Sequence, residues 1–140
     1  MIRKYKESDL PTVIEIWYEA STIAHPFLKR EFVARVKKDM EEIYIPKGET
    51  WVFEDDERII GFIGMIGNEI GGLFVKPDQQ SKGIGTKLVD FIKQFHSELE
   101  VEVFKENPIG RAFYDKYGFK HIKEFFHEDS GNQVLRLKLS

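Results

Sequence analysis

The stretch that constrains the fold most strongly is residues 69–95, EIGGLFVKPDQQSKGIGTKLVDFIKQF. It begins as an apolar strand, passes through a polar turn that contains two glycines, and continues as an amphipathic helix. The buried face of this helix is expected to carry Leu88, Val89, Ile92 and Phe95. The next segment, 98–104, alternates strictly between polar and apolar residues and predicts another strand. A strand, a helix and a second strand in this order predict one parallel step in the sheet.

The rest of the chain supplies the other elements. Residues 2–5 predict a first strand, and Ser8 is expected to cap a helix with Pro11 in its first turn. A loop at 23–27 is expected to end this helix, because the residue before Pro26 is disfavoured in a helix. The apolar positions of a second helix are Phe32, Val36, Met40 and Ile43. Further predicted elements are a hairpin of strands 49–54 and 58–66, a helix 108–117 between Asn107 and Gly118, and a closing strand pair 119–126 and 133–139.

The resulting order, βααβββαβαββ, predicts an α+β (mixed α/β) fold around one mixed, largely antiparallel sheet. The chain has 140 residues, of which 41% are hydrophobic and 32% charged. This length and composition suit one globular domain over residues 1–140, with no repeat or linker.

The composition also excludes several classes of site. The chain has no cysteine, which removes disulfides, thiolate metal sites and a cysteine nucleophile, and is compatible with a reducing cytoplasm. The four histidines are scattered and predict no metal site. A net charge of −3 gives no reason to expect nucleic-acid binding, and neither a secretory signal nor a membrane span is recognised.

The two glycines of the turn QSKGIG, residues 80–85, point to an anion. A glycine-rich turn before a helix presents free N–H groups and the positive end of the helix dipole. The phosphate loop of nucleotide-binding proteins needs Lys-Ser or Lys-Thr after its last glycine, whereas Thr86 precedes Lys87 here. The dinucleotide fingerprint needs a third glycine where Leu88 stands.

The turn instead resembles the Gln/Arg-x-x-Gly-x-Gly/Ala loop of the GCN5-related N-acetyltransferases (GNAT superfamily). Residues 71–92 resemble the core segment of this family, and NPIGRAFYDKYGF, residues 107–119, resembles its second segment. WYEASTIAHPFL, residues 17–28, is similar to small bacterial members that include peptidyl-lysine acetyltransferases. The resemblance implies the GNAT fold, with four helices and with the fourth and fifth strands splayed apart, over essentially the whole chain.

The resemblance further implies that the turn holds the diphosphate of acetyl-CoA as cosubstrate. The expected phosphate contacts are Gln80, Ser81, Lys82, Gly83, Ile84, Gly85 and Thr86. Lys82, Lys87 and Lys76 would add positive charge. Gly71 and Gly72 suit a β-bulge that opens the gap between the strands. The backbone of Leu73, Phe74 and Val75 would pair with the pantetheine arm, and an N–H near Phe74 would polarise the thioester carbonyl. Asn107 would reach the pantetheine amide in addition to capping its helix.

Three residues are predicted to act in catalysis by direct attack of an amine. Tyr114 aligns with the family tyrosine that protonates the departing thiolate. Glu102 is the first choice for the group that accepts the proton of the amine, with Glu69 or a water wire as the alternatives. His25 would contact the acceptor or relay a proton.

The acceptor is left open by the sequence. A protein lysine or an N-terminal amine is favoured, and the alternatives are a small amine or aminoglycoside, or a non-catalytic protein that senses acyl-CoA. Acidic stretches at 54–57 and 37–42 hint at a cationic acceptor. A cytoplasmic location, possibly as a homodimer, is the expectation for the intact protein.

Overall fold

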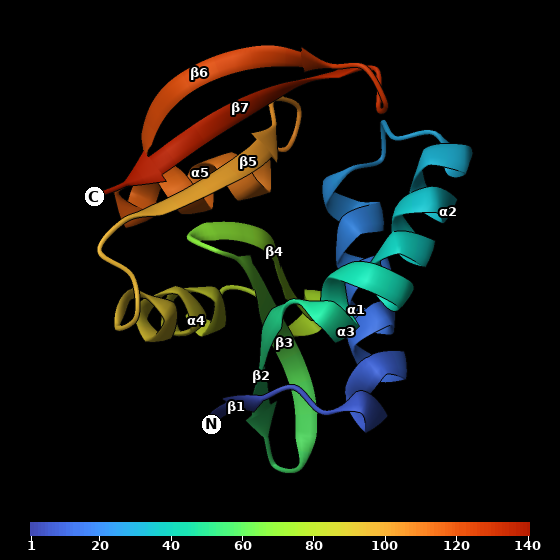
Figure 1. Cartoon of the computed structure of the whole chain (residues 1–140), viewed down its shortest axis with the longest axis vertical. Coiled ribbons are helices and arrows are strands. Elements are labelled where there is room, and N and C mark those ends of the chain that lie inside the picture. Colours follow the sequence, from blue (N-terminus) through green and yellow to red (C-terminus); the bar gives the residue numbers. More distant parts are fainter.

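The computed structural model describes residues 1–140 (Figure 1). Its strands are β1 (Ile2–Lys4), β2 (Glu49–Asp55), β3 (Arg58–Ile66), β4 (Glu69–Val75), β5 (Leu99–Phe104), β6 (Lys120–His127) and β7 (Asn132–Leu139). Its α-helices are α1 (Leu10–Ala24), α2 (Arg30–Asp39), α3 (Ile45–Lys47), α4 (Ile84–Lys93) and α5 (Pro108–Tyr117). A π-helical turn, Met40–Tyr44, joins α2 to α3, so residues 30–47 form one continuous helical segment.

All seven strands form one sheet in the order β1-β2-β3-β4-β5-β7-β6. Every neighbouring pair is antiparallel except β4 and β5, which are parallel and are joined through α4. The predicted mixed, largely antiparallel sheet and its four helices are therefore confirmed, with α3 counted as the end of the second helical segment. The inclusion of strands from both ends of the chain in one sheet is consistent with a single domain.

The predicted splay between β4 and β5 is the feature that opens the sheet. Their parallel pairing is limited to Glu69 opposite Glu100 and Ile70 opposite Val101. In β4 the register then shifts, because Gly72 pairs with Gly64 while Ile70 pairs with Met65. Gly71 is therefore the extra residue of a β-bulge, which bends the strand away from β5 beyond this point. Figure 1 shows β4 and β5 diverging from each other.

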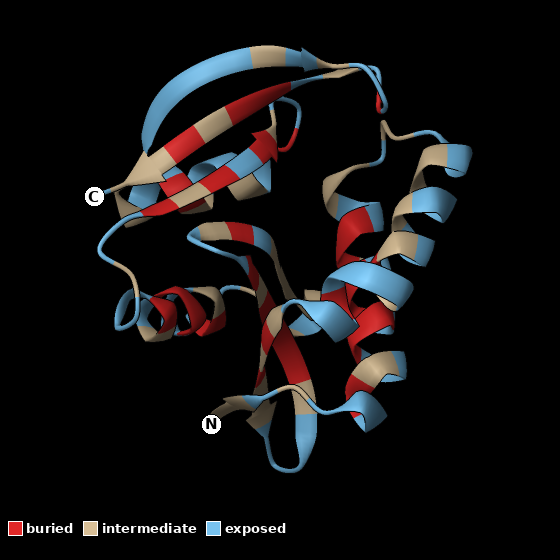
Figure 2. Cartoon of the chain, in the orientation of Figure 1, coloured by how far each residue is buried: buried red, intermediate tan, exposed pale blue.

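Two apolar cores lie on the two faces of the sheet. One packs α1, Met40 and Ile45 against Val52 and Phe62 of the N-terminal strands. The larger core packs α4 and α5 against strands from both halves of the sheet. By contrast, β6 is an edge strand and most of its residues are exposed (Figure 2). None of the helices combines the length and the apolar composition of a membrane span.

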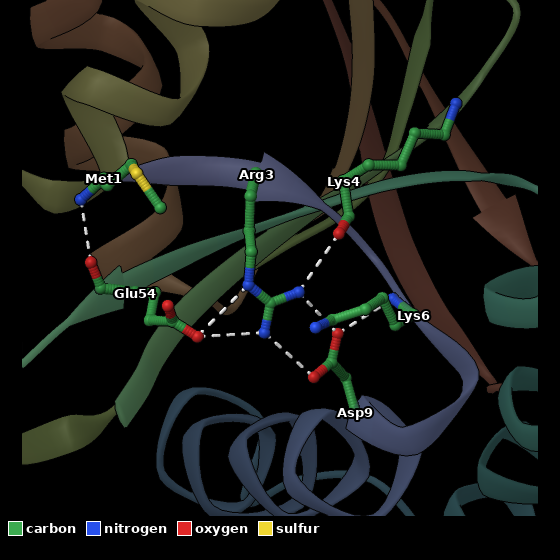
Figure 3. Close-up of polar contacts among 6 residues, drawn as sticks. All are labelled: Met1, Arg3, Lys4, Lys6, Asp9 and Glu54. Carbon is green, nitrogen blue, oxygen red and sulfur yellow. Dashed lines mark hydrogen bonds and ion pairs between the residues drawn. The ribbon is translucent and has the colours of Figure 1, made fainter. Parts of the chain in front are cut away.

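The start of the first helix differs from the prediction that Ser8 caps it. A 3₁₀ turn, Glu7–Asp9, precedes α1, so Asp9 stands directly before the helix. The Asp9 carboxylate accepts the N–H of Lys6 at 2.8 Å and pairs with the guanidinium of Arg3, which also binds Glu54 (Figure 3). These hydrogen bonds lower the pKa of Asp9. The prediction that Ser8 caps α1 was wrong. Arg3 of β1 holds the carboxylate of Asp9, the residue after Ser8, at the start of the helix.

Two apolar residues expected in the core are exposed instead. Ile43 is 45% exposed because the π-helical turn shifts the faces of the second helical segment, which leaves Met40 and Ile45 buried. Phe95 is 56% exposed because α4 ends at Lys93. Its ring stacks on that of Trp51, with centroids 6.3 Å apart.

Candidate active site

A cavity of about 980 Å³ passes through the gap between β4 and β5. It is lined by residues of α1 and α2 at one end and by the α4 turn and α5 at the other. Of the predicted site residues, all line this cavity except the three lysines Lys76, Lys82 and Lys87. Three of its lining residues are charged, namely Glu69, Glu102 and Lys116.

The turn before α4 forms a row of free donors. The Gln80 N–H donates to the Pro77 carbonyl at 3.5 Å, and the next backbone donor along the chain is the Lys87 N–H, which donates to the Gly83 carbonyl at 3.0 Å. The N–H groups of residues 81–86, which lie between them, donate to no protein atom. Ser81 and Gly83 both have left-handed backbone, with φ of 68° and 80°. Such a run of N–H groups at the start of a helix makes a concave anion site. The geometry therefore fits a phosphate group.

The lysines and the second glycine of this turn have other contacts in the structure. Lys82 lies outside the cavity, and its ammonium donates to Gln79 Oε1 at 3.1 Å. Lys87 lies over the ring of Phe53. At Gly85 a Cβ atom would come within 3.2 Å of the Phe113 ring. Gly85 is therefore needed for the close approach of α5 as well as for an open turn.

The splayed part of β4 exposes one edge of its backbone. The Lys76 N–H donates to the Ile60 carbonyl of β3 at 2.8 Å. Because the bonding direction alternates along an antiparallel pair, the N–H and C=O groups of Val75 and Leu73 point away from β3, into the gap. The free donors thus flank Phe74 rather than belonging to it.

Tyr114 lies on α5 and is 7% exposed, in edge contact with Phe113 and Phe119. Burial raises the pKa of its phenol well above the ordinary value, so the hydroxyl stays protonated at neutral pH. No side-chain hydrogen bond engages this hydroxyl, and the residue lines the cavity. It is a proton donor available to a group in the cavity.

His25 ends α1 and joins it to the start of α5. Its Nδ1 lies 3.1 Å from Ser21 Oγ, and its Nε2 lies 3.1 Å from Asn107 Nδ2. The ring packs edge-on against Phe27 and Phe104. Burial lowers the pKa of His25 to about 4, so the ring is neutral at pH 7. The predicted cap of α5 is confirmed, because Asn107 Oδ1 accepts the Gly110 N–H at 2.9 Å.

Three carboxylates share one cation, and two of them, Glu69 and Glu102, line the cavity. Arg136 of β7 donates to Glu100 and Glu102 at 2.7 Å each and to Glu69 at 3.3 Å. This arrangement raises the pKa of the Arg136 guanidinium. Both candidates for the base, Glu102 and Glu69, therefore start from an ion pair. The group of four side chains carries a net negative charge next to the cavity.

Several residues of the site were missed by the sequence analysis. Arg136 was not singled out, because its place opposite Glu102 follows from the pairing of β5 with β7, which the local sequence does not reveal. The wall of the cavity opposite the carboxylates is apolar and is formed by Trp17, Leu28, Phe32, Val33, Val36, Met40 and Tyr44. The acidic stretches 54–57 and 37–42 contribute no carboxylate to the cavity, since Met40 alone among them lines it. No group of three His, Asp or Glu side chains could hold a metal ion.

Comparisons with known proteins agree with this geometry. Residues 46–121 match the family model described as acetyltransferase (GNAT) domain. The chain is 32% identical over 130 residues to peptidyl-lysine N-acetyltransferase YiaC of Escherichia coli, which covers 92% of this chain and 88% of the relative. It is 28% identical to peptidyl-lysine N-acetyltransferase YjaB of the same organism, over 99% of this chain and 95% of that one.

Solved structures share the fold. The solution structure of apo-form YjaB from Escherichia coli has a TM-score of 0.87 at 26% identity and covers 99% of this chain and 95% of that one. The PaiA N-acetyltransferase of Thermoplasma acidophilum, solved in complex with coenzyme A, has a TM-score of 0.78 at 24% identity, with 99% and 98% covered. The match of the family model to more than half of the chain, together with these relatives, shows that this protein is an acyltransferase that belongs to the GNAT acetyltransferase family.

Proposed function

We propose that this protein transfers the acetyl group of acetyl-CoA to the side-chain amine of a lysine in a peptide or protein. The names of the relatives YiaC and YjaB support this acceptor. The cytoplasm as its location and a homodimer as its assembly are proposals from the family resemblance.

The proposed binding mode follows the length of the cavity. The diphosphate of acetyl-CoA would accept from the free N–H groups of residues 81–86, where Gly83 and Ser81 turn the backbone toward it. The pantetheine arm would lie along the open edge of Leu73, Phe74 and Val75. Asn107, which lines the same stretch, keeps a second amide N–H that can donate to this arm.

The proposed reaction is a direct attack. The neutral amine forms a C–N bond with the thioester carbonyl carbon, and the C–S bond breaks. That neutral amine arises when the acceptor ammonium passes a proton to Glu102, or through water to Glu69. As the C–S bond breaks, the Tyr114 hydroxyl gives a proton to the departing thiolate and is restored by the proton that the nitrogen loses. The N–H groups that flank Phe74 would stabilise the oxyanion. His25 is proposed to bound the acceptor end of the cavity.

The chemistry of the acceptor end is the observation that carries the choice of lysine. The cavity residues from α1, α2 and the segments that follow them are mostly apolar, whereas β4 and β5 present Glu69 and Glu102. An aliphatic stem with a cationic head matches both walls. An aminoglycoside carries many hydroxyl groups, for which an apolar wall offers no hydrogen-bonding partners.

The test is acetylation of a panel of acceptors, followed by mass spectrometry. The panel holds lysine peptides, the same peptides with norleucine in place of lysine and a free N-terminus, a diamine and an aminoglycoside. We expect transfer to the lysine side chain. Transfer to the norleucine peptides would identify an N-terminal acetyltransferase, and preference for the aminoglycoside would overturn the proposal. Tight acetyl-CoA binding without any transfer would favour a sensor.

A further inference from the structure

Four polar groups connect α1 to α5 across the acceptor end of the cavity. Ser21, His25, Asn107 and the Gly110 N–H follow one another at 3.1, 3.1 and 2.9 Å. Ser21 and Asn107 are both buried, so these bonds are shielded from water. His25 and Asn107 are 82 positions apart in the chain, and their contact joins two segments that the sheet topology brings to the same place.

The donors and acceptors of this row are determined by its last member. The Gly110 N–H can only donate, so the atom of Asn107 that faces it must be the carbonyl oxygen. The amide NH₂ of Asn107 then faces His25 and donates to Nε2, which must carry a lone pair. The ring proton is therefore on Nδ1 and is donated to Ser21 Oγ.

The contact bears on the helix that carries Tyr114. Asn107, Gly110 and Tyr114 are spaced by three and four positions, which places them on one face of α5. All three line the cavity. On the other side, His25 is packed between Phe27 and Phe104, at the wall where we propose the acceptor binds.

We propose that His25 is a positioning residue. As the neutral Nδ1–H tautomer, it accepts from Asn107 and holds the first turn of α5, and with it Tyr114, in register with the acceptor wall. Its effect on turnover rests on the proposed function, whereas the contact and the tautomer do not.

Two variants of His25 separate this role from packing. In His25→Gln the side-chain oxygen can take the place of Nε2 and accept from Asn107, whereas the shorter side chain of His25→Asn reaches only the place of Nδ1. We expect His25→Asn to lower kcat by about tenfold or more, because small displacements of catalytic groups are costly. His25→Gln should stay within about threefold of the wild type, and KM for acetyl-CoA should change little in both. Equal losses in the two variants would overturn the proposal.

A spectroscopic test needs no acceptor. In ¹⁵N NMR spectra of the wild type at pH 7, His25 should show a protonated Nδ1 and an unprotonated Nε2. In Asn107→Asp a carboxylate would face Nε2, so this nitrogen should become protonated at the same pH. An Nε2–H tautomer in the wild type, or an Nε2 that does not respond to Asn107→Asp, would contradict the contact. If no acceptor is found, these spectra still decide the structural part, and failure of the proposed function is seen separately in the acceptor panel.

Discussion

Gln80 Nε2 donates to the carbonyl oxygen of Val75 at 3.1 Å, which ties the turn before α4 to the end of β4. The glutamine that opens the motif is thus engaged with protein backbone, and the free donors of the turn belong to residues 81–86. The turn and the open strand edge are held in one arrangement by this bond. A cosubstrate that contacts both would depend on it.

Gln80→Glu should weaken acetyl-CoA binding by about tenfold to a hundredfold. The carboxylate cannot donate to the Val75 carbonyl, and the loss of such a bond in a partly buried site costs about 1–3 kcal/mol. Calorimetric titration with acetyl-CoA measures the change. Gln79→Glu is the matched control, because it adds the same charge one residue earlier and can still accept from Lys82. Equal weakening in both variants would show a general charge effect.

Tyr114→Phe should lower kcat by about 10²–10⁴, the usual contribution of a general acid. The ring contacts with Phe113 and Phe119 remain, so the melting temperature and the affinity for acetyl-CoA should change little. Tyr117→Phe is the control, because its hydroxyl is bound to Asp90. Steady-state kinetics and thermal melting decide the matter. An unchanged kcat in Tyr114→Phe would assign the thiolate proton to water.

Glu102→Gln should lower kcat at neutral pH by about tenfold or more, if the carboxylate accepts the proton of the amine. The loss should shrink as pH rises, because more of the acceptor amine is then already deprotonated. Glu98→Gln serves as the control, since Glu98 directly precedes β5, pairs with Lys138 and does not line the cavity. A uniform loss at every pH would instead indicate that Glu102 acts through its bond with Arg136.

His25 should make folding stability depend on pH. Its folded pKa is about 4, whereas the unfolded value is about 6.5. Above pH 6.5 both states are neutral and the contribution is complete, and it is lost as pH falls toward 4 because the unfolded chain binds the proton first. Between pH 7 and 4.5 we expect a loss of about 2–3 kcal/mol from this group.

Urea unfolding of the wild type and of His25→Gln at the two pH values isolates that loss. The side chains that face His25 are Ser21, Phe27, Phe104 and Asn107, none of them charged. The carboxylates elsewhere titrate equally in both proteins and cancel in the comparison. The same pH dependence in His25→Gln would contradict the burial of a neutral imidazole.

Local patterns made most of the fold predictable. The alternation of 98–104 and the caps Asn107 and Gly118 depend on neighbours along the chain, and the structure confirms all of them. The prediction of Ser8 as the helix cap was wrong because Arg3, on another element, holds the carboxylate of Asp9. The prediction that Ile43 lies on the buried face of the second helix was wrong because a π-helical turn changes the helical period. A pattern of regular spacing cannot anticipate this change.

The candidate site was predictable only where a motif is contiguous. The turn 80–86 and Tyr114 belong to such motifs, and apart from Lys82 these residues line one cavity. The partners of His25 and of Glu102 lie 82 and 34 positions away. Contacts at such separations depend on how the strands are ordered in the sheet, so they carry no signature in the local sequence.

β4 and β5 share fewer residue pairs than any other neighbouring strands in the sheet. Two residue pairs join the four N-terminal strands to the three C-terminal strands, and beyond the bulge at Gly71 the two strands no longer pair with each other. A pantetheine arm bound there, as we propose, would form hydrogen bonds with the strand edges where β4 and β5 do not pair. It would thereby connect the two parts of the sheet. Cosubstrate binding would then slow amide hydrogen exchange in β4 and β5 together.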